Sequence, residues 1–176
     1  MSKLAFIFPG QGAQKAGMGK DFYENSEAAR SFFDQAQKIL DFDLKEMCFG
    51  EHEELNLTEY TQPCMVSVCL AIVRELKKRG INPDITAGLS LGEYAAVAAA
   101  GGMNELDAIK LVRRRGILMQ STVPAGEGAM AAVLGLDAKK IEEILESFEN
   151  VWIANYYCPG QIVITGLINE VQQASL

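Results

Sequence analysis

The sequence predicts an α/β protein with a parallel sheet at its core, and three segments carry this prediction. Residues 4–8 are a short apolar run that ends at Pro9 and Gly10, as a buried strand does where it enters a tight loop. Residues 84–87 form a brief extended stretch that leads through a glycine-flanked turn into an alanine-rich helix pattern. From about residue 128 onward, short strand and helix patterns alternate in a new order.

Helices are expected around the strands of the first part. Apolar side chains recur at helical spacing in residues 26–40, after a capping residue at 25 or 26. A second helix is expected over residues 61–78, with Pro63 in its first turn, where a missing N–H costs nothing. A third starts at Asn104, with acidic residues near its positive end and three arginines at 113–115 further along, as the helix dipole favours.

The second part reads as β-α-β-β-α after a connector, residues 122–127, that contains Pro124 and Gly126. Strands are expected at 129–134, 151–154 and 161–165, with a helix from the cap Asp137 to residue 148 and another from about Asn169. A ferredoxin-like split βαβ module needs one more strand after that helix. We therefore expect two domains, a core over 1–123 and an incomplete ferredoxin-like subdomain over 128–176.

Composition excludes several classes of function. The chain of 176 residues has a formal charge of −7 and a sequence pI near 4.8, which argues against nucleic acid or an anionic membrane as the main partner. The four cysteines, Cys48, Cys64, Cys69 and Cys158, show no CxxC spacing, and His52 is the only histidine. No set of zinc ligands is expected, and the cysteines are expected to be reduced, partly buried thiols.

Targeting and membrane segments are not expected. The longest nearly apolar run, residues 64–73, is too short to span a bilayer and is interrupted by Ser67. The apolar stretch before Pro9 is too short for a signal peptide. We therefore expect a cytoplasmic protein.

The turn Gly88-Leu89-Ser90-Leu91-Gly92 has the GxSxG pattern of a nucleophile elbow, as in hydrolase-like α/β folds. Flanking glycines allow the backbone to bend sharply and lift the serine hydroxyl clear of the sheet. Ser90 is thus the candidate nucleophile, and the N–H of Leu91, at a helix start, can point at an oxyanion. The alternative is a glycine-rich turn that merely contains a serine.

An oxyanion hole generally needs a second donor. The glycine-rich loop that follows the first strand, residues 9–14, is the candidate, with Gln11 as the position nearest Ser90. The alternative for this loop is a tight turn with a solvated glutamine.

Seven blocks of residues occur in the order and spacing of malonyl-CoA:acyl carrier protein transacylases, and the chain resembles that family from Lys3 to its C-terminus. The blocks are Phe8-Pro9-Gly10-Gln11-Gly12-Ala13-Gln14, Thr61-Gln62-Pro63, Leu89-Ser90-Leu91-Gly92-Glu93-Tyr94, Arg115-Gly116, Met119-Gln120, Gly128-Ala129-Met130-Ala131-Ala132-Val133 and Pro159-Gly160-Gln161-Ile162-Val163.

The resemblance implies a ping-pong reaction of fatty acid biosynthesis without a bound cofactor. Ser90 takes the malonyl group from coenzyme A as an ester and passes it to the phosphopantetheine thiol of acyl carrier protein. By the same resemblance, Gln11 and Leu91 supply backbone N–H groups to the oxyanion, and Arg115 pairs with the malonyl carboxylate. Gln62 corresponds to a glutamine that orders the loop around Gln11.

A physical argument supports Arg115 independently. A guanidinium presents a planar fork to a carboxylate, so it holds a malonyl group and disfavours an acetyl group. Arg113 and Arg114 are expected to form a solvated helix face, because adjacent helical residues point in different directions.

The sequence departs from the family pattern in two ways. Leu89 stands where the family usually carries histidine before the nucleophile. No histidine follows Ser90, although a serine nucleophile needs a base and the family takes it from a histidine further along the chain. His52 lies in an acidic stretch that is expected to be an exposed loop. We therefore expect a truncated product, a gene fragment or one part of a split enzyme, with weak or no activity alone.

Two other functions stay open at this point. A serine hydrolase or thioesterase shares the elbow, since water can replace the thiol. A non-catalytic fragment would bind acyl carrier protein or a complementary chain, with the cations at 77–79 or 113–114 as candidate contacts to an acidic partner.

Overall fold

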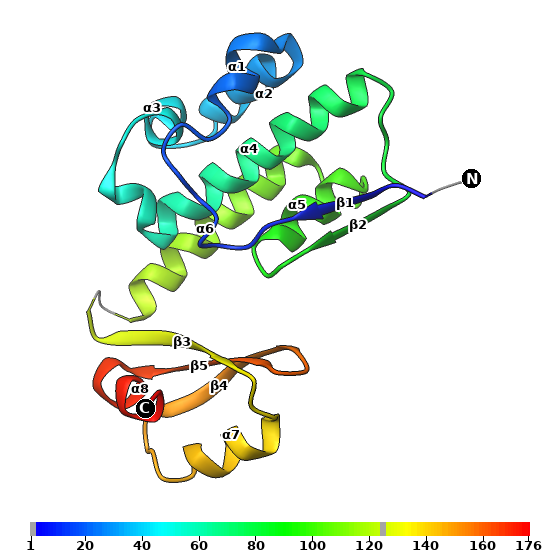
Figure 1. Cartoon of the computed structure of the whole chain (residues 1–176). Helices are drawn as coiled ribbons and strands as arrows, with labels where there is room; N and C mark the ends of the chain where they lie inside the picture. Colours follow the sequence, from blue (N-terminus) through cyan, green and yellow to red (C-terminus); the bar gives the residue numbers. More distant parts are fainter. Residues whose placement is uncertain (1–2, 124–125) are drawn as a thin grey trace. The chain divides into compact units, whose positions relative to one another are not determined.

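The computed structural model describes residues 3–123 and 126–176, which form two compact units, Met1–Gln120 and Ser121–Leu176 (Figure 1). Both combine helices with strands, and the α/β class expected from the sequence is confirmed. The expected connector falls partly on Pro124 and Ala125, which lie outside the described residues. Each unit is described by itself.

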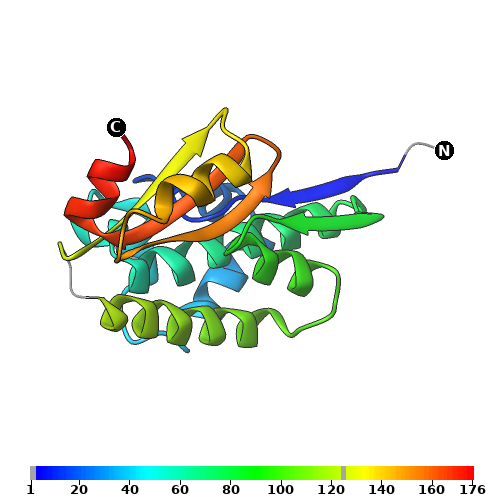
Figure 2. The same cartoon turned by 90° about the horizontal axis from the view of Figure 1, so that it is seen from below.

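The larger unit holds two parallel strands, β1 (Ala5–Phe8) and β2 (Ile85–Gly88), paired from Ala5↔Ile85 to Phe8↔Gly88. Figure 2 shows the two strands side by side, with α5 (Gly92–Ala99) next to β2. Phe8 is buried, whereas Ile7 is 79% exposed and Ile85 is 62% exposed. One face of the strand pair therefore packs against helices, and the other presents apolar side chains to solvent.

Helices make up most of this unit. Its central element is α4 (Thr58–Lys78), which packs against α2 (Glu27–Gln37). The others are α1 (Lys20–Asn25), α3 (Leu44–Phe49), the short 3-10 helix η1 (Glu53–Asn56) and α6 (Glu105–Thr122), which continues past Gln120. The core joins Phe32 and Phe33 of α2 to apolar residues of α4, α5 and α6.

The expected helix starts are close to those observed. Ser26 caps α2, because its hydroxyl accepts from the Ala29 N–H at 3.0 Å. Asn104 likewise accepts from the N–H groups of Leu106 and Asp107 at the start of α6. The helices α1 and α3 and the helix η1 were not expected, since each is only four to six residues long and too short to show a clear period.

The expected place of Pro63 is wrong. Helix α4 begins at Thr58, three residues before the expected start, so Pro63 is its sixth residue and lies inside the helix. A proline there leaves the carbonyl of residue i−4, Glu59, without its helical donor. Arg113 of α6 supplies the replacement, because its Nη1 donates to the Glu59 carbonyl oxygen at 2.8 Å.

The smaller unit has a three-stranded antiparallel sheet in the order β3-β5-β4. Its elements are β3 (Gly128–Leu134), α7 (Ala138–Leu145), β4 (Val151–Cys158), β5 (Gln161–Leu167) and α8 (Ile168–Ala174). Strand β4 runs four residues beyond its expected end, across register shifts that the sequence pattern hides. A small core of Ile141, Val151, Ile162, Ile164 and Val171 joins the sheet to both helices.

Candidate active site

Ser90 occupies a sharp turn between a parallel strand and a helix. Strand β2 ends at Gly88 and α5 begins at Gly92, so the turn is only three residues long. Ser90 has φ +50° and is the only non-glycine residue with positive φ among the described residues. A left-handed backbone is costly for a residue with a Cβ, and such strain gathers at functional sites. The side chain of Ser90 is exposed at this turn.

The two glycines of the GxSxG pattern are required by close backbone contacts. A Cβ on Gly88 would lie 2.1 Å from the carbonyl carbon of Gly92, and one on Gly92 would lie 2.3 Å from the carbonyl oxygen of Phe8. Neither contact can be relieved by moving a side chain, since both atoms are backbone atoms. The pattern therefore fixes a turn that lies directly against the end of β1.

The loop after β1 lies beside this turn. The N–H of Leu89 donates to the Phe8 carbonyl at 3.1 Å, and a Cβ on Gly10 would lie 2.9 Å from the Leu89 carbonyl oxygen. The backbone N–H groups of Gln11 and Leu91 donate to none of the described residues. Two candidate donors to an oxyanion thus lie on segments that contact each other next to Ser90.

The side chain of Gln62 contacts the side chain of Gln11. It is fully buried in the second turn of α4, and its Nε2 lies 3.5 Å from Oε1 of Gln11 and 3.4 Å from Sδ of Met119. Its own Oε1 has no partner among the described residues. The Gln11 amide also donates to Oγ1 of Thr58 at 3.0 Å, so the loop is held at the N-terminal end of α4.

The three adjacent arginines of α6 have different surroundings. Arg114 is exposed, as expected, but the expectation of a solvated Arg113 is wrong: its side chain is only 13% exposed. It pairs with Asp41 and Glu59, and its guanidinium lies over the rings of Phe42 and Tyr60. Burial opposes the charged form of Arg113, but the hydrogen bonds to its two carboxylates outweigh this and raise its pKa.

Arg115 is half-buried and has no carboxylate partner among the described residues. Its guanidinium carbon lies 5.6 Å from the centre of the Tyr94 ring. Tyr94 is in the first turn of α5, four residues after Ser90, so the Arg115 cation lies against the helix that begins just after the turn at Ser90. Gly116 allows α6 to lie close to the start of α4, because a Cβ on Gly116 would lie only 2.8 Å from the Thr58 carbonyl oxygen.

The structure does not bring His52 to this site as a free base. His52 lies between α3 and η1, half-buried rather than exposed as expected, with Nε2 3.1 Å from Oε1 of Glu46. Leu89, next to Ser90 in the turn, is 51% exposed.

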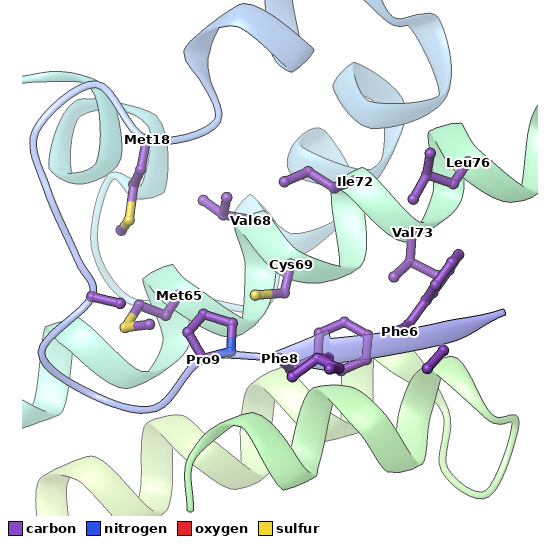
Figure 3. A pocket seen from close by; sticks show the side chains of 13 residues that line it. Phe6, Phe8, Pro9, Met18, Met65, Val68, Cys69, Ile72, Val73 and Leu76 are labelled. Carbon is purple, nitrogen blue, oxygen red and sulfur yellow. The ribbon is translucent and has the colours of Figure 1, made fainter. Parts of the chain in front are cut away.

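An apolar pocket lies elsewhere in the larger unit. It has a volume of about 390 Å³ between β1 and α4, where Phe6, Phe8, Met65 and Cys69 line it (Figure 3). Burial raises the pKa of the Cys69 thiol to about 11, so this cysteine stays protonated at neutral pH. All four cysteines are free. Ser90, Gln11 and Arg115 do not line this pocket.

No group of three or more His, Cys, Asp or Glu side chains could hold a metal ion within residues 3–123 and 126–176. Over the same residues, no helix is both long and apolar enough to cross a membrane.

Residues 5–175 match the model of one protein family, the acyl transferase domain. The chain belongs to the acyl transferase family. The malonyl CoA-acyl carrier protein transacylase of Bacillus subtilis (strain 168) is 48% identical over 180 residues, a match that covers 99% of this chain and 57% of the relative. The transacylase of Staphylococcus aureus (strain MSSA476) is 47% identical and covers 97% of this chain and 58% of its own length.

Solved structures of acyl transferases agree with this assignment. The malonyl CoA-acyl carrier protein transacylase of Clostridium perfringens matches with a TM-score of 0.89 and 44% identity, over 98% of this chain and 56% of that one. A type II PKS acyl-carrier protein in complex with its malonyl-transacylase matches with a TM-score of 0.89 and 39% identity, over 98% and 58%. The resemblance drawn from the motifs is confirmed, and the chain spans about 57% of the length of its curated relatives.

Some residues of the site were not identified from the sequence. In the sequence, Tyr94 appears only as part of a motif block, although its spacing of four from Ser90 places both residues near one face of a helix start. Thr58 has no signal in the sequence, and the motif block Met119-Gln120 does not show which residue Gln120 bonds, because the partners of both are distant in sequence.

Proposed function

We propose that this chain carries the nucleophilic half of an acyltransferase that moves a malonyl group from coenzyme A to acyl carrier protein. The observation that carries the proposal is the combination of Ser90 at φ +50° with an unpaired guanidinium, Arg115, over the helix that begins at the same turn. Within the described part of this unit, no contact explains why the Ser90 backbone is strained or why the Arg115 guanidinium is half-buried without a carboxylate partner. Both are explained by a covalent acyl ester that ends in a carboxylate.

The first half-reaction begins with the Ser90 hydroxyl. Its oxygen attacks the thioester carbonyl carbon of malonyl-CoA, and the hydroxyl proton passes to a base. The oxyanion that forms accepts from the N–H groups of Gln11 and Leu91. The C–S bond then breaks, the CoA thiolate takes up a proton, and a malonyl ester remains on Ser90. The phosphopantetheine thiol of acyl carrier protein reverses these steps and carries the malonyl group away.

Arg115 provides the selectivity for malonyl in this proposal. The carboxylates of Asp41 and Glu59 neutralise Arg113, whereas Arg115 has no carboxylate partner within the described residues and lies over the ring of Tyr94. A bidentate pair with the malonyl carboxylate satisfies a cation that is otherwise left half-buried. An acetyl group leaves it unpaired and is disfavoured.

The proton acceptor is the part of the mechanism that this chain does not supply. Its one histidine, His52, is engaged with Glu46. We infer that the base comes from polypeptide outside these residues, which corresponds to the part of the relatives that the match does not span. The isolated chain is then weakly active or inactive.

The same polypeptide is proposed to cover the outer face of β1 and β2. Parallel sheets are normally buried on both faces, yet Ile7 and Ile85 are exposed here, and the apolar pocket opens beside β1. The unspanned part of the Bacillus subtilis relative, added as a separate chain, should co-purify with this one. The variant Ile7→Lys should abolish the complex, with Ile81→Lys, at another exposed apolar residue, as control.

The finer features of the fold are proposed on the same grounds. The turn at Ser90 is proposed to be a nucleophile elbow on a hydrolase-like core over residues 1–123. The order β3-β5-β4 with two helices fits a ferredoxin-like subdomain over residues 128–176.

Acyl carrier protein is proposed as the partner, in line with the solved transacylase complex. Most of the basic side chains at 77–79 and 113–114 already have partners within the chain. Lys77 donates to the Ala99 carbonyl at 2.8 Å, and Lys78 pairs with Glu27 at 3.1 Å. Among these side chains, Arg114 alone has no partner within the described residues, so it is the better candidate for a contact with acyl carrier protein.

Mass spectrometry after incubation with malonyl-CoA tests the function. The protein used is this chain completed by the unspanned part of the Bacillus subtilis relative. An adduct of one malonyl group should form and should be absent in Ser90→Ala, with Ser121→Ala as the matched control. No adduct in the completed protein would overturn the proposal.

The Arg115→Ala variant tests the selectivity. It should shift the preference of the completed protein from malonyl towards acetyl thioesters, whereas Arg114→Ala should not. Rapid release of free malonate without a thiol acceptor would instead identify a serine hydrolase.

A further inference from the structure

Thr58 and Gln120 connect the loop after β1 to helix α6 through two hydrogen bonds. Oε1 of Gln120 accepts from the Thr58 N–H at 3.0 Å, and Oγ1 of Thr58 accepts from Nε2 of Gln11 at 3.0 Å. Gln62 adds a third bond, from its Nε2 to Oε1 of Gln11 at 3.5 Å. The Gln11 amide is thus held on both its nitrogen and its oxygen.

The start of α4 explains why Gln120 is needed. The first N–H groups of a helix have no partner within it and are commonly capped by the side chain that precedes them. The residue at that place is Leu57, which has no polar side chain and makes no cap. Gln120 therefore acts as a cap supplied from another helix, and it fixes the residue that holds Gln11.

Helix α6 carries both the cation and this cap. Arg115 and Gln120 lie five residues apart on it, and the close contact of Gly116 with Thr58 sets the distance between α6 and α4. The position of the oxyanion loop and that of the carboxylate clamp are therefore set by one helix. The two ends of a bound malonyl group would be located by the same element.

We propose that Thr58 and Gln120 are positioning residues that place the backbone N–H of Gln11 for the oxyanion. The inference rests on the proposed function, since it concerns the same site. Neither residue touches the reacting atoms. Loss of the Thr58 hydroxyl would leave the Gln11 side chain held only by Gln62 among the described residues, and loss of Gln120 would leave the Thr58 N–H without its partner. In either case the loop backbone would sample orientations in which its N–H misses the oxyanion.

Variants of Thr58 separate this role from general stability. Thr58→Val removes the acceptor oxygen and keeps the branched shape, whereas Thr58→Ser keeps the oxygen. In the completed protein described above, Thr58→Val should lower kcat for malonyl transfer about tenfold with little change in KM. Thr58→Ser should restore at least half of the wild-type kcat, and Gln120→Ala should resemble Thr58→Val.

Asp43→Ala is the matched control for the loss of a helix cap. Asp43 accepts from the N–H groups of Lys45 and Glu46 at the start of α3 and makes no described contact with the loop after β1. It should lower the melting temperature as much as Gln120→Ala does, but leave kcat unchanged.

The outcomes distinguish this inference from the function itself. If Ser90→Ala keeps the malonyl adduct, the proposed function fails. If Ser90→Ala loses the adduct but Thr58→Val turns over at the wild-type rate, only the positioning role is overturned. A fall in kcat that Thr58→Ser does not restore, or that Asp43→Ala reproduces, would also overturn it.

Discussion

Replacing Arg113 by methionine should destabilise the larger unit, because one guanidinium there satisfies several acceptors. Its Nε and Nη2 donate to the two carboxylate oxygens of Asp41, each at 2.9 Å, and its Nη1 donates to the carbonyl and to Oε2 of Glu59. Methionine keeps an apolar chain against the rings of Phe42 and Tyr60. The change therefore removes the polar contacts of residue 113 and keeps its apolar ones.

The cost can be divided between the two partners. The Glu59 carbonyl would be left without a donor, because Pro63 has no N–H to offer, and an unsatisfied buried group costs about 1–3 kcal/mol. Asp41 adds at most about 1 kcal/mol, because its side chain is 67% exposed and water can replace the arginine. The sum is about 1–4 kcal/mol.

A second change separates the two contributions. Pro63→Ala provides an N–H that can donate to the Glu59 carbonyl within the helix. In that background, Arg113→Met should cost about 1–3 kcal/mol less than in the wild type, and this difference is the coupling energy of a double-mutant cycle.

Unfolding in urea, followed by far-UV circular dichroism, measures these free energies. Fluorescence is unsuitable, since the one tryptophan, Trp152, lies in the smaller unit. Equal costs of Arg113→Met in both backgrounds would refute the idea that Arg113 replaces the missing N–H. The hydrogen bond from Arg113 lowers the pKa of Asp41, so its share of the stability is present above the unfolded pKa of about 4 and is lost as pH falls through the folded value.

Two further changes test single contacts. Gly92→Ala should unfold the turn at Ser90 or cost more than about 3 kcal/mol, because the new Cβ would lie 2.3 Å from the Phe8 carbonyl oxygen. Gly102→Ala should cost under about 1 kcal/mol in the same urea assay, because its new Cβ would lie 3.2 Å from a side-chain atom of Val97 and 3.4 Å from the Val97 carbonyl oxygen. Glu170→Gln should weaken the smaller unit at pH 7 but not below pH 3. Hydrogen bonds from the side chain and backbone of Asn150 lower the pKa of Glu170, so its stabilisation exists above the unfolded pKa of about 4.3 and is lost as pH falls through the folded value. Tryptophan fluorescence during unfolding checks this, and an equal loss at both pH values would contradict it.

Much of the fold could be predicted because its signals are local. A cap such as Ser26 or Asn104 acts on N–H groups two or three residues away, and the strand, turn and helix around Ser90 follow one another without a break. The short helices α1 and α3 were missed for the same reason, since a local period cannot show in six residues.

The sequence indicated which residues are candidates for the site, but not the hydrogen bonds that connect them. The residue types and spacing of the GxSxG turn identified Ser90, and the motif blocks identified Gln11, Gln62 and Arg115 as candidates. By contrast, Thr58 is 47 residues from Gln11 and 62 from Gln120, and no periodic pattern joins them.

The sequence by itself determined the strand-turn-helix that presents Ser90, because the bend needs glycines that neighbouring positions supply. It also determined the family, through motif blocks spread over the chain. Only the tertiary structure decided which arginine is neutralised. Adjacent arginines are equivalent in a local pattern, and Arg113 is neutralised by two carboxylates that lie 54 and 72 residues away in the sequence and meet it only in the folded unit. Within the described residues, Arg114 and Arg115 have no carboxylate partner.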